Sequence, residues 1–168
     1  ELEKFYKKYL TESDYFLNVS SRIKSPMSLK EKILRNNYYL MFSDAEEFFF
    51  ELSDLIGIRL ECRFIEDEEK LYQAIKRIFC LQRPDGYYYN DEFPNILLNL
   101  TDKQPQIQKN GFEIYRLDGI IIGESATFHY ELQLKSLVNM FWGEIEHKIL
   151  YKNYNYMPIE DFYRDIMS

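Results

Sequence analysis

The chain has 168 residues, of which 46% are hydrophobic and 17% aromatic, with only six Gly and five Pro. This is enough apolar material for one well-filled core but too short a chain for two ordinary domains, so we expect a single domain over residues 1–168. The net charge of −7 argues against a general nucleic-acid coat or a binder of anionic membranes, because both need a cationic surface.

The sequence shows neither a membrane-spanning run nor the pattern of a signal peptide in its first residues. No apolar run approaches the ~20 residues needed to span a bilayer, and the N-terminal stretch ELEKFYKKYL lacks the apolar segment of a signal peptide. We therefore expect a soluble, cytoplasmic protein with no membrane partner. Cys62 and Cys80 have neither CxxC spacing nor nearby histidines, so we predict two buried free thiols rather than a disulfide or a zinc site.

Helical patterns dominate the first part of the chain. The spacing LxxFYxxYL predicts an amphipathic helix within residues 1–16. Ser25 followed by Pro26 is a typical N-cap and first helical residue, and predicts a second helix over 26–40. Residues 18–24, NVSSRIK, are expected to connect the two, and Ser43 with Asp44 predicts the start of a third helix.

A strand and a helix follow. Residues 57–64, GIRLECRF, alternate between apolar and polar, which predicts a half-buried strand with Ile58, Leu60, Cys62 and Phe64 on its apolar face. Residues 66–80 have an acidic start, a basic end and an apolar stripe, as expected for an amphipathic helix. The next stretch, 81–95, is rich in turn residues and is predicted to be a long loop.

The remaining segments are two strands and a helix. Residues 111–123 and 126–134 read as strands, and in the second the side chains of Thr127, His129, Glu131, Gln133 and Lys135 share the polar face. We predict that such polar faces line one groove. The terminal helix, 136–153, has candidate core contacts at Leu137, Met140, Phe141, Ile145 and Ile149. This order of elements predicts an α+β fold in which one mixed sheet carries its helices on one face.

A basic cluster stands out in this acidic chain. Residues 21–35, SRIKSPMSLKEKILR, hold five basic residues and a single acidic one. Hydroxyls at Ser25 and Ser28, together with the exposed amides of a helix start, would suit a polyphosphate. A capped surface helix with ordinary solvating lysines explains the same residues, and chemistry alone favours that alternative.

Two carboxylates are candidates for magnesium binding. Asp54 lies where a helix gives way to a strand, and Glu131 projects from the middle of a strand; oxygen ligands of this kind suit a small hard cation. Each also has an ordinary explanation, as a turn residue or a solvent-facing side chain. The chain contains neither a GxxxxGK[ST] loop nor a GxGxxG fingerprint, so any nucleotide is bound by another architecture.

Four segments in order, SRIKSPMSLKEK, DLIGIRLECRF, KNGFEIYRLDG and ELQLKSLVNMFWGEIEHKILYKN, resemble the synthetase domain of the RelA/SpoT family. The resemblance covers about residues 18–153. It implies a nucleotidyltransferase-like fold and Mg²⁺-dependent transfer of the β,γ-pyrophosphate of ATP to the ribose 3′-hydroxyl of GTP or GDP, which makes (p)ppGpp. It also implies a homo-oligomer, with a tetramer as one form.

The resemblance assigns roles to residues. The implied ATP-binding residues are Arg22, Lys24, Ser28, Lys32 and Arg59, and the implied acceptor-binding residues are Lys109, Asn110, Phe112, Arg116, Gln133 and Lys135. Asp54 and Glu131 would be the catalytic and metal-binding carboxylates. The chain lacks an HD dipeptide, so we expect no alarmone hydrolase domain.

The acceptor motif departs from the family pattern. Where NGYxSxH is usual, this chain has NGFEIYR, with Phe112 in place of tyrosine and Arg116 in place of histidine. QIRT is replaced by QLKS, which exchanges an arginine fork for the point charge of Lys135. Two alternatives therefore stay open: the same transfer to another acceptor such as the 3′ end of tRNA, or a nucleotide-binding regulatory domain without catalysis.

Overall fold

The structure is a computed structural model that describes residues 1–41, 52, 55–108, 111–124 and 126–146. Its centre is a mixed sheet with the strand order β1-β2-β8-β7-β5-β4-β3. The strands are β1 (Asn18–Ile23), β2 (Ile56–Cys62), β3 (Leu81–Gln82), β4 (Tyr88–Asn90), β5 (Phe93–Leu98), β7 (Glu113–Ile122) and β8 (Thr127–Ser136), and β6 (Gln106–Ile107) pairs with β7. In this part of the chain β2 and β8 run parallel, whereas the other pairs are antiparallel.

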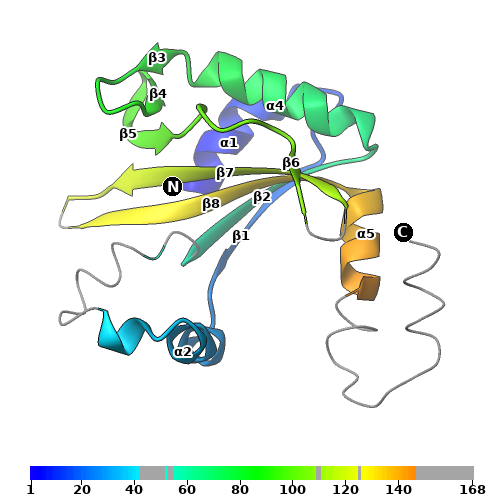
Figure 1. Cartoon of the computed structure of the whole chain (residues 1–168). Coiled ribbons are helices and arrows are strands. Elements are labelled where there is room, and N and C mark those ends of the chain that lie inside the picture. Colours follow the sequence, from blue (N-terminus) through cyan, green and yellow to red (C-terminus); the bar gives the residue numbers. More distant parts are fainter. Residues whose placement is uncertain (42–51, 53–54, 109–110, 125, 147–168) are drawn as a thin grey trace.

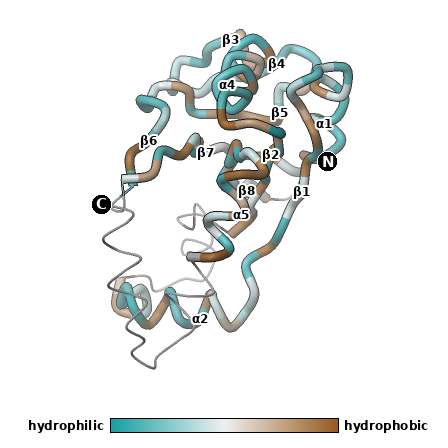
Figure 2. Tube along the Cα trace, turned by 90° about the vertical axis from the view of Figure 1, so that its right-hand side faces the viewer, coloured by the Kyte–Doolittle hydropathy of each residue, from teal (hydrophilic) through white to brown (hydrophobic). Residues whose placement is uncertain are grey.

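Helices flank the sheet on both sides, as Figures 1 and 2 show. They are α1 (Leu2–Leu10), α2 (Pro26–Arg35), α4 (Glu66–Ile78) and α5 (Leu137–Glu146), with a short 3-10 helix η1 (Tyr38–Leu40). The α+β prediction is confirmed. The prediction that all helices lie on one face is wrong, because α1 and α4 cover one face while α2 and α5 lie on the other side of the sheet.

The core forms where α1 and α4 pack on the apolar face of the sheet. Its fully buried side chains include Phe5, Tyr6 and Leu10 of α1, Leu71 and Ile75 of α4, and Ile58, Leu60, Leu132 and Leu134 of the two parallel strands. The alternation predicted for β2 and β8 is therefore confirmed. Phe64, expected on the same face, lies beyond the end of β2 and is exposed.

A glycine and a tyrosine fix the contact between β7 and β8. Gly119 pairs with Tyr130, and the Tyr130 ring lies so close that a Cβ on Gly119 would be 2.3 Å from its Cζ. The Tyr130 hydroxyl donates to the carbonyl oxygen of Leu97 at 3.2 Å and lies 3.1 Å from the Tyr6 hydroxyl. Burial raises the pKa of both tyrosines well above the usual value, so each hydroxyl keeps its proton.

Short strands account for most errors in the secondary-structure prediction. Residues 18–23 form an edge strand rather than a connection, and residues 81–95 contain β3, β4 and the start of β5 rather than a loop. In β1 only Val19 is buried, and β3 and β4 are two and three residues long. Such segments carry too little alternation to be recognised.

Three smaller predictions also need correction. The first helix ends at Leu10, where turns involving Ser13 and Phe16 follow. Cys80 is exposed, whereas Cys62 is buried as predicted, because Cys80 lies just past the end of α4. On α5, Leu137 and Phe141 are 45% and 63% exposed, since only part of this helix rests on the sheet.

The helix predicted from Ser43 lies largely outside the described residues. Within the described part of the chain, no helix combines the length and apolar character that crossing a membrane requires.

Candidate active site

The polar face of the sheet carries two adjacent rows of side chains that cross four strands. In one row Arg22 pairs with Gly57, Gly57 with Glu131, and Glu131 with Asp118. In the next row Ser20 pairs with Arg59, Arg59 with Gln133, and Gln133 with Arg116. Paired residues of neighbouring strands point to the same face, so both rows look away from the core.

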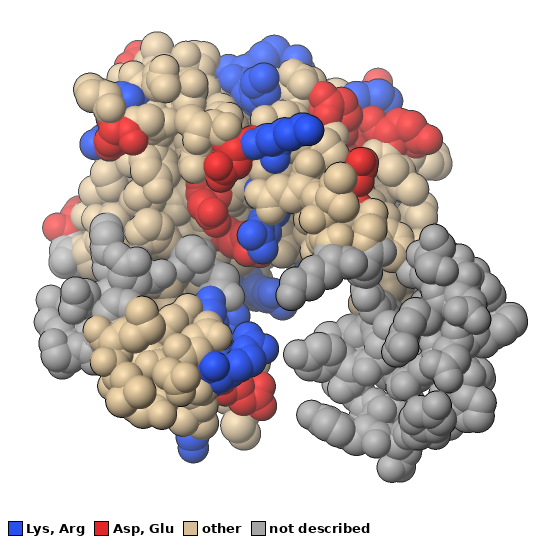
Figure 3. Space-filling model, in the orientation of Figure 1, with Lys and Arg blue, Asp and Glu red and all other residues tan. Residues whose placement is uncertain are grey.

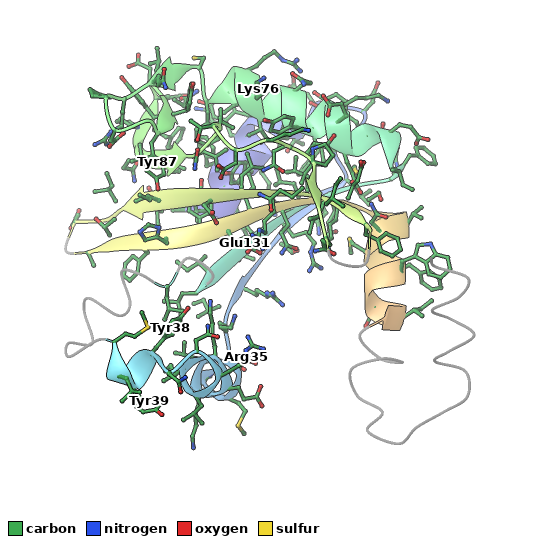
Figure 4. The ribbon with its side chains drawn as sticks, in the orientation of Figure 1. Arg35, Tyr38, Tyr39, Lys76, Tyr87 and Glu131 are labelled. Atoms are coloured by element: carbon green, nitrogen blue, oxygen red, sulfur yellow. The ribbon has the colours of Figure 1, made fainter. Side chains whose placement is uncertain are left out.

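The parts of these rows on β1, β2 and β8 line a cleft of about 250 Å³, with Arg22, Arg59, Glu131 and Gln133 among its lining residues. Figure 3 shows acidic and basic side chains gathered at the centre of the molecule, above α2. In Figure 4 Glu131 lies on the side of the sheet that faces Arg35 and Tyr38, whereas Lys76 of α4 is on the opposite side. The prediction of one groove lined by polar strand faces is confirmed.

Gly57 leaves room for the Arg22 side chain in the first row. A Cβ on Gly57 would be 3.3 Å from both Cγ and Nε of Arg22, which is tighter than an ordinary contact. The Arg22 side chain therefore lies over the backbone of β2 and extends from the edge strand toward Glu131. This position lets a cation of β1 serve a site centred on β8.

Glu131 is held at the centre of the cleft from two directions. Its Oε1 accepts a 2.5 Å hydrogen bond from Gln133 Nε2, and its Oε2 lies 3.8 Å from Arg116 Nε. The Glu131 side chain is 16% exposed and that of Arg116 is 47% exposed. Arg116 is itself fixed through its backbone, which exchanges hydrogen bonds with the side chain of Gln104.

Cations surround this carboxylate in excess. Arg59 has a buried Nε with no hydrogen-bond partner in the described part of the chain. Burial, followed by the charges of Arg59 and Arg22, lowers the pKa of Lys135, while Glu68 and Glu131 act in the opposite direction. A buried donor without a partner and a destabilised ammonium both favour an anion in this place.

The helix start at α2 is built as predicted but stands outside the cleft. Ser25 is the N-cap, and its Oγ accepts from the backbone N of Ser28 at 3.2 Å and donates to Ser28 Oγ at 3.0 Å. Pro26 begins the helix, and no α2 residue is buried. Lys24 lies between β1 and α2, and neither it nor Ser28 or Lys32 lines the cleft formed by Arg22 and Arg59.

A second pocket lies beside the cleft, between α4, β8 and α5. Its lining includes Phe112, Lys135, Glu68, Asn139 and Trp142. Lys135 connects the two sites, because it lines this pocket and its charge acts on the groups of the cleft. Of the predicted acceptor-binding residues, Phe112 and Lys135 are thus placed in this pocket, while Arg116 and Gln133 contact Glu131.

Lys109, Asn110 and Asp54, predicted as acceptor-binding and metal-binding residues, lie outside the described residues. The described residues of the site that were not predicted include Asp118, Glu68, Asn139 and Trp142. A signal existed for Glu68, which falls on the apolar stripe of its helix at the spacing of Leu71 and Ile75. The sequence contains no such signal for Asp118, because its position opposite Glu131 depends on strand register.

The carboxylates of the first row suit a magnesium ion. Glu131 and Asp118 are direct cross-strand partners, and two like charges in this arrangement repel unless a cation lies near. Among the described residues no group of three or more His, Cys, Asp or Glu gathers to hold a metal. A magnesium ion bound here by Glu131 would therefore retain several water ligands, as this ion usually does.

Comparisons with known proteins agree with this architecture. The chain is 23% identical over 152 residues to GTP pyrophosphokinase YwaC of Bacillus subtilis, and this match covers 84% of the chain but 61% of the relative. The chain therefore spans about three fifths of the length of that relative.

Solved structures share the fold. A GTP pyrophosphokinase family protein from Streptococcus pneumoniae superimposes with a TM-score of 0.67 at 18% identity, over 98% of this chain and 75% of that one. Small alarmone synthetase 1 from Bacillus subtilis gives 0.64 when bound to AMPCPP and 0.61 when bound to its product pppGpp, both at 20% identity. These matches cover 99% and 98% of this chain, and 80% and 75% of the synthetase chains.

The family model described as a region found in RelA / SpoT proteins matches residues 21–156. This range contains Arg22 of the edge strand, the paired rows of the cleft apart from Ser20, and the pocket between α4, β8 and α5. The chain belongs to the RelA/SpoT family.

Proposed function

We propose that the protein transfers the β,γ-pyrophosphoryl group of ATP to the 3′-hydroxyl of GTP or GDP. The observation that carries the proposal is the position of Glu131, between the cations Arg22 and Arg59 on one side and the pocket of Phe112 and Lys135 on the other. Small alarmone synthetase 1 supports the same chemistry, since its structures include one bound to AMPCPP and one bound to its product pppGpp.

The geometry gives each group a part in the transfer. Arg22 and Arg59 hold the phosphates of ATP, with the buried Arg59 Nε donating to a phosphate oxygen or to the adenine. Lys24, Ser28 and Lys32 on the α2 side complete the donor site. Mg²⁺, with Glu131 and Asp54 as its expected ligands, would neutralise phosphate charge.

The bond changes follow from this arrangement. The acceptor 3′-oxygen attacks the β-phosphorus of ATP, the bond from that phosphorus to the α,β-bridging oxygen breaks, and AMP leaves. Glu131 takes the proton of the 3′-hydroxyl, because Gln133 and Arg116 orient its carboxylate within the cleft. Lys135, Arg116 and Gln133 position the acceptor, together with Lys109 and Asn110, and Phe112 stacks on its base.

Incubation with ATP, Mg²⁺ and either GDP or GTP tests the proposal, with AMP and the pyrophosphorylated nucleotide as products. Glu131→Gln should reduce turnover by about 100- to 10,000-fold, the range expected for loss of a general base, without lowering the melting temperature. Glu124→Gln, an exposed change of the same charge after β7, is the matched control.

The acceptor is decided by the same assay. Transfer of label from γ-labelled ATP to tRNA but not to guanine nucleotides would overturn the assignment of the acceptor, and absence of AMP with every acceptor would overturn the enzymatic proposal. No feature of the described residues favours tRNA or a purely regulatory role. The expected homo-oligomer belongs to this proposal as well, and sedimentation of the full chain measures it.

A further inference from the structure

The pocket under α5 contains a buried carboxylate that the transfer described above does not use. Glu68 is the third residue of α4 and is only 3% exposed. It shares the inward face of the helix with Leu71, Tyr72 and Ile75, which are also buried. Of the other acidic residues at the start of α4, Glu66 and Glu69 are exposed, as expected for charges that interact favourably with a helix N-terminus. Asp67 is buried as well, but its carboxylate is paired with Lys70 at 2.7 Å.

Both hydrogen bonds of Glu68 with described residues end on the same oxygen. Its Oε1 accepts from the backbone N of Ser136 at 2.6 Å and from Asn139 Nδ2 at 2.8 Å. These bonds join α4 to the start of α5, where Ser136 Oγ also accepts from the backbone N of Asn139. The second oxygen, Oε2, makes no hydrogen bond with the described part of the chain.

The connection between α4 and α5 does not by itself require a buried carboxylate. Burial of a charged group costs far more than burial of a neutral amide, and a single acceptor oxygen would satisfy Ser136 and Asn139. The side chain lines the pocket, so a further acceptor oxygen is available to a molecule bound there.

The other walls of the pocket suit a flat heterocycle. Phe112 and Trp142 are both among its lining residues, and Trp142 is 40% exposed. Aromatic side chains of this kind stack on nucleobases. Lys135 lies beside them, with its Nζ 3.8 Å from the position of a Cβ on Gly143, and provides a cation for the phosphates of the same nucleotide.

We propose that Glu68 selects the base of the acceptor nucleotide by accepting hydrogen bonds from the N–H groups of guanine. This inference rests on the proposed function, because it takes the pocket as the acceptor site. Guanine presents N1–H and the N2 amino group side by side, both of which donate. Adenine presents the lone pair of N1 beside its amino group, and this lone pair is repelled by a carboxylate.

Nucleotide affinities measured without turnover test whether Glu68 selects guanine. The full chain is saturated with a non-hydrolysable ATP analogue, and its affinities for GDP, IDP and ADP are measured by titration calorimetry. IDP lacks the N2 amino group, so the wild-type chain should bind GDP about 10-fold more tightly than IDP and about 100-fold more tightly than ADP. Equal affinities for the three nucleotides in the wild type would overturn the proposal without the use of any variant.

Glu68→Gln replaces Oε2, the oxygen proposed to contact the base, but keeps an acceptor oxygen for the residues of α5. Its amide oxygen can replace Oε1 toward Ser136 and Asn139, but an NH₂ donor then takes the place of Oε2. The affinity for GDP should fall about 10- to 100-fold, because a hydrogen bond to a charged acceptor is lost and a buried donor opposes N1–H. The affinity for ADP should rise, because the lone pair of adenine N1 then faces a donor instead of a carboxylate, so that the preference for guanine disappears.

Two matched variants separate base selection from a structural role. Glu66→Gln makes the same charge change on the exposed side of α4, and Ser136→Ala removes the cap of α5 without removing a pocket-lining side chain. The first should leave all three affinities unchanged, and the second should change them by a common factor. A common factor for Glu68→Gln as well would mean that Glu68 only anchors α5, which contradicts the proposal.

The outcome for base selection is distinct from that for the transfer reaction. Lost guanine preference in Glu68→Gln, in a protein that forms no AMP with any acceptor, would support the role of Glu68 and refute the transfer. Conversely, efficient transfer to GDP with an unchanged ratio of GDP to IDP use in Glu68→Gln would support the transfer and refute base selection.

Discussion

Gly119→Ala is expected to destabilise the protein more than any other glycine-to-alanine change described above. The added Cβ would be 2.3, 2.4 and 2.7 Å from Cζ, Cε1 and the hydroxyl oxygen of Tyr130. These are far below van der Waals contact, and the Tyr130 ring is fully buried. The ring must therefore move, and its hydrogen bonds to Tyr6 and Leu97 must stretch or break.

The expected loss in the free energy of unfolding has two sources, the displaced ring and its broken hydrogen bonds. Overpacking of a well-packed core costs about 1–3 kcal/mol, and leaving buried polar groups without partners costs about 1–3 kcal/mol more. A loss of about 4 kcal/mol lowers the melting temperature of a chain of this size by roughly 8–16 °C. Urea denaturation followed by circular dichroism measures the free energy of unfolding directly.

A matched glycine and a double variant sharpen the test. At Gly143, inside α5, the new Cβ would meet only Lys135 Nζ at 3.8 Å, so Gly143→Ala should stabilise by about 0.5–1 kcal/mol through helix propensity. Combining Gly119→Ala with Tyr130→Leu should cost less than the sum of the single changes. Additive costs, or a cost below about 1 kcal/mol for Gly119→Ala alone, would refute the assigned clash.

Other predictions concern the cleft and the two thiols. Gly57→Ala should displace the Arg22 side chain, since the new Cβ would be 3.3 Å from it, and lower kcat/KM for ATP roughly 10-fold with little change in melting temperature; unchanged kinetics would contradict the role of this gap. Burial lowers the pKa of Lys135 in the folded state, so the unfolded chain binds the proton more readily. The free energy of unfolding should therefore rise as pH increases from neutral toward the ordinary lysine pKa of 10.5. Urea titrations of Lys135→Met should lack that rise, and an identical pH profile would exclude Lys135 as its source. Iodoacetamide followed by mass spectrometry should label the exposed Cys80 and spare Cys62, whose pKa is raised to about 12 chiefly by burial; labelling of Cys62 in the folded protein would contradict its burial.

The sequence predicts best those strands that have one buried and one solvated face. In β2 and β8 the alternation of apolar and polar side chains assigns Arg59 and Glu131 correctly to the polar face. The N-cap at Ser25 was equally predictable, because its hydrogen bond with Ser28 depends only on local residues.

Edge strands and register could not be predicted in the same way. Residues 18–23 expose most of their side chains, and only pairing with β2 makes them a strand. The placement of Arg22 and Glu131 in one cleft depends on a parallel pairing of β2 with β8, which joins segments about 70 residues apart and leaves no local signal. The prediction that these two residues belong to one site therefore came from the resemblance to a known family and not from periodicity.

The cleft and the pocket on either side of Lys135 are built from different elements, and this has a consequence for how such a protein could diversify. The groups proposed to carry out the transfer lie on strands β1, β2, β8 and β7, whereas the neighbouring pocket takes Glu68 from α4 and Trp142 from α5. If the proposals hold, substitutions on the two helices would alter which base is accepted while the strands proposed to carry out the transfer keep their pairing. In the proposed enzyme, a new acceptor is therefore within reach of a few helix substitutions, without any rebuilding of the sheet.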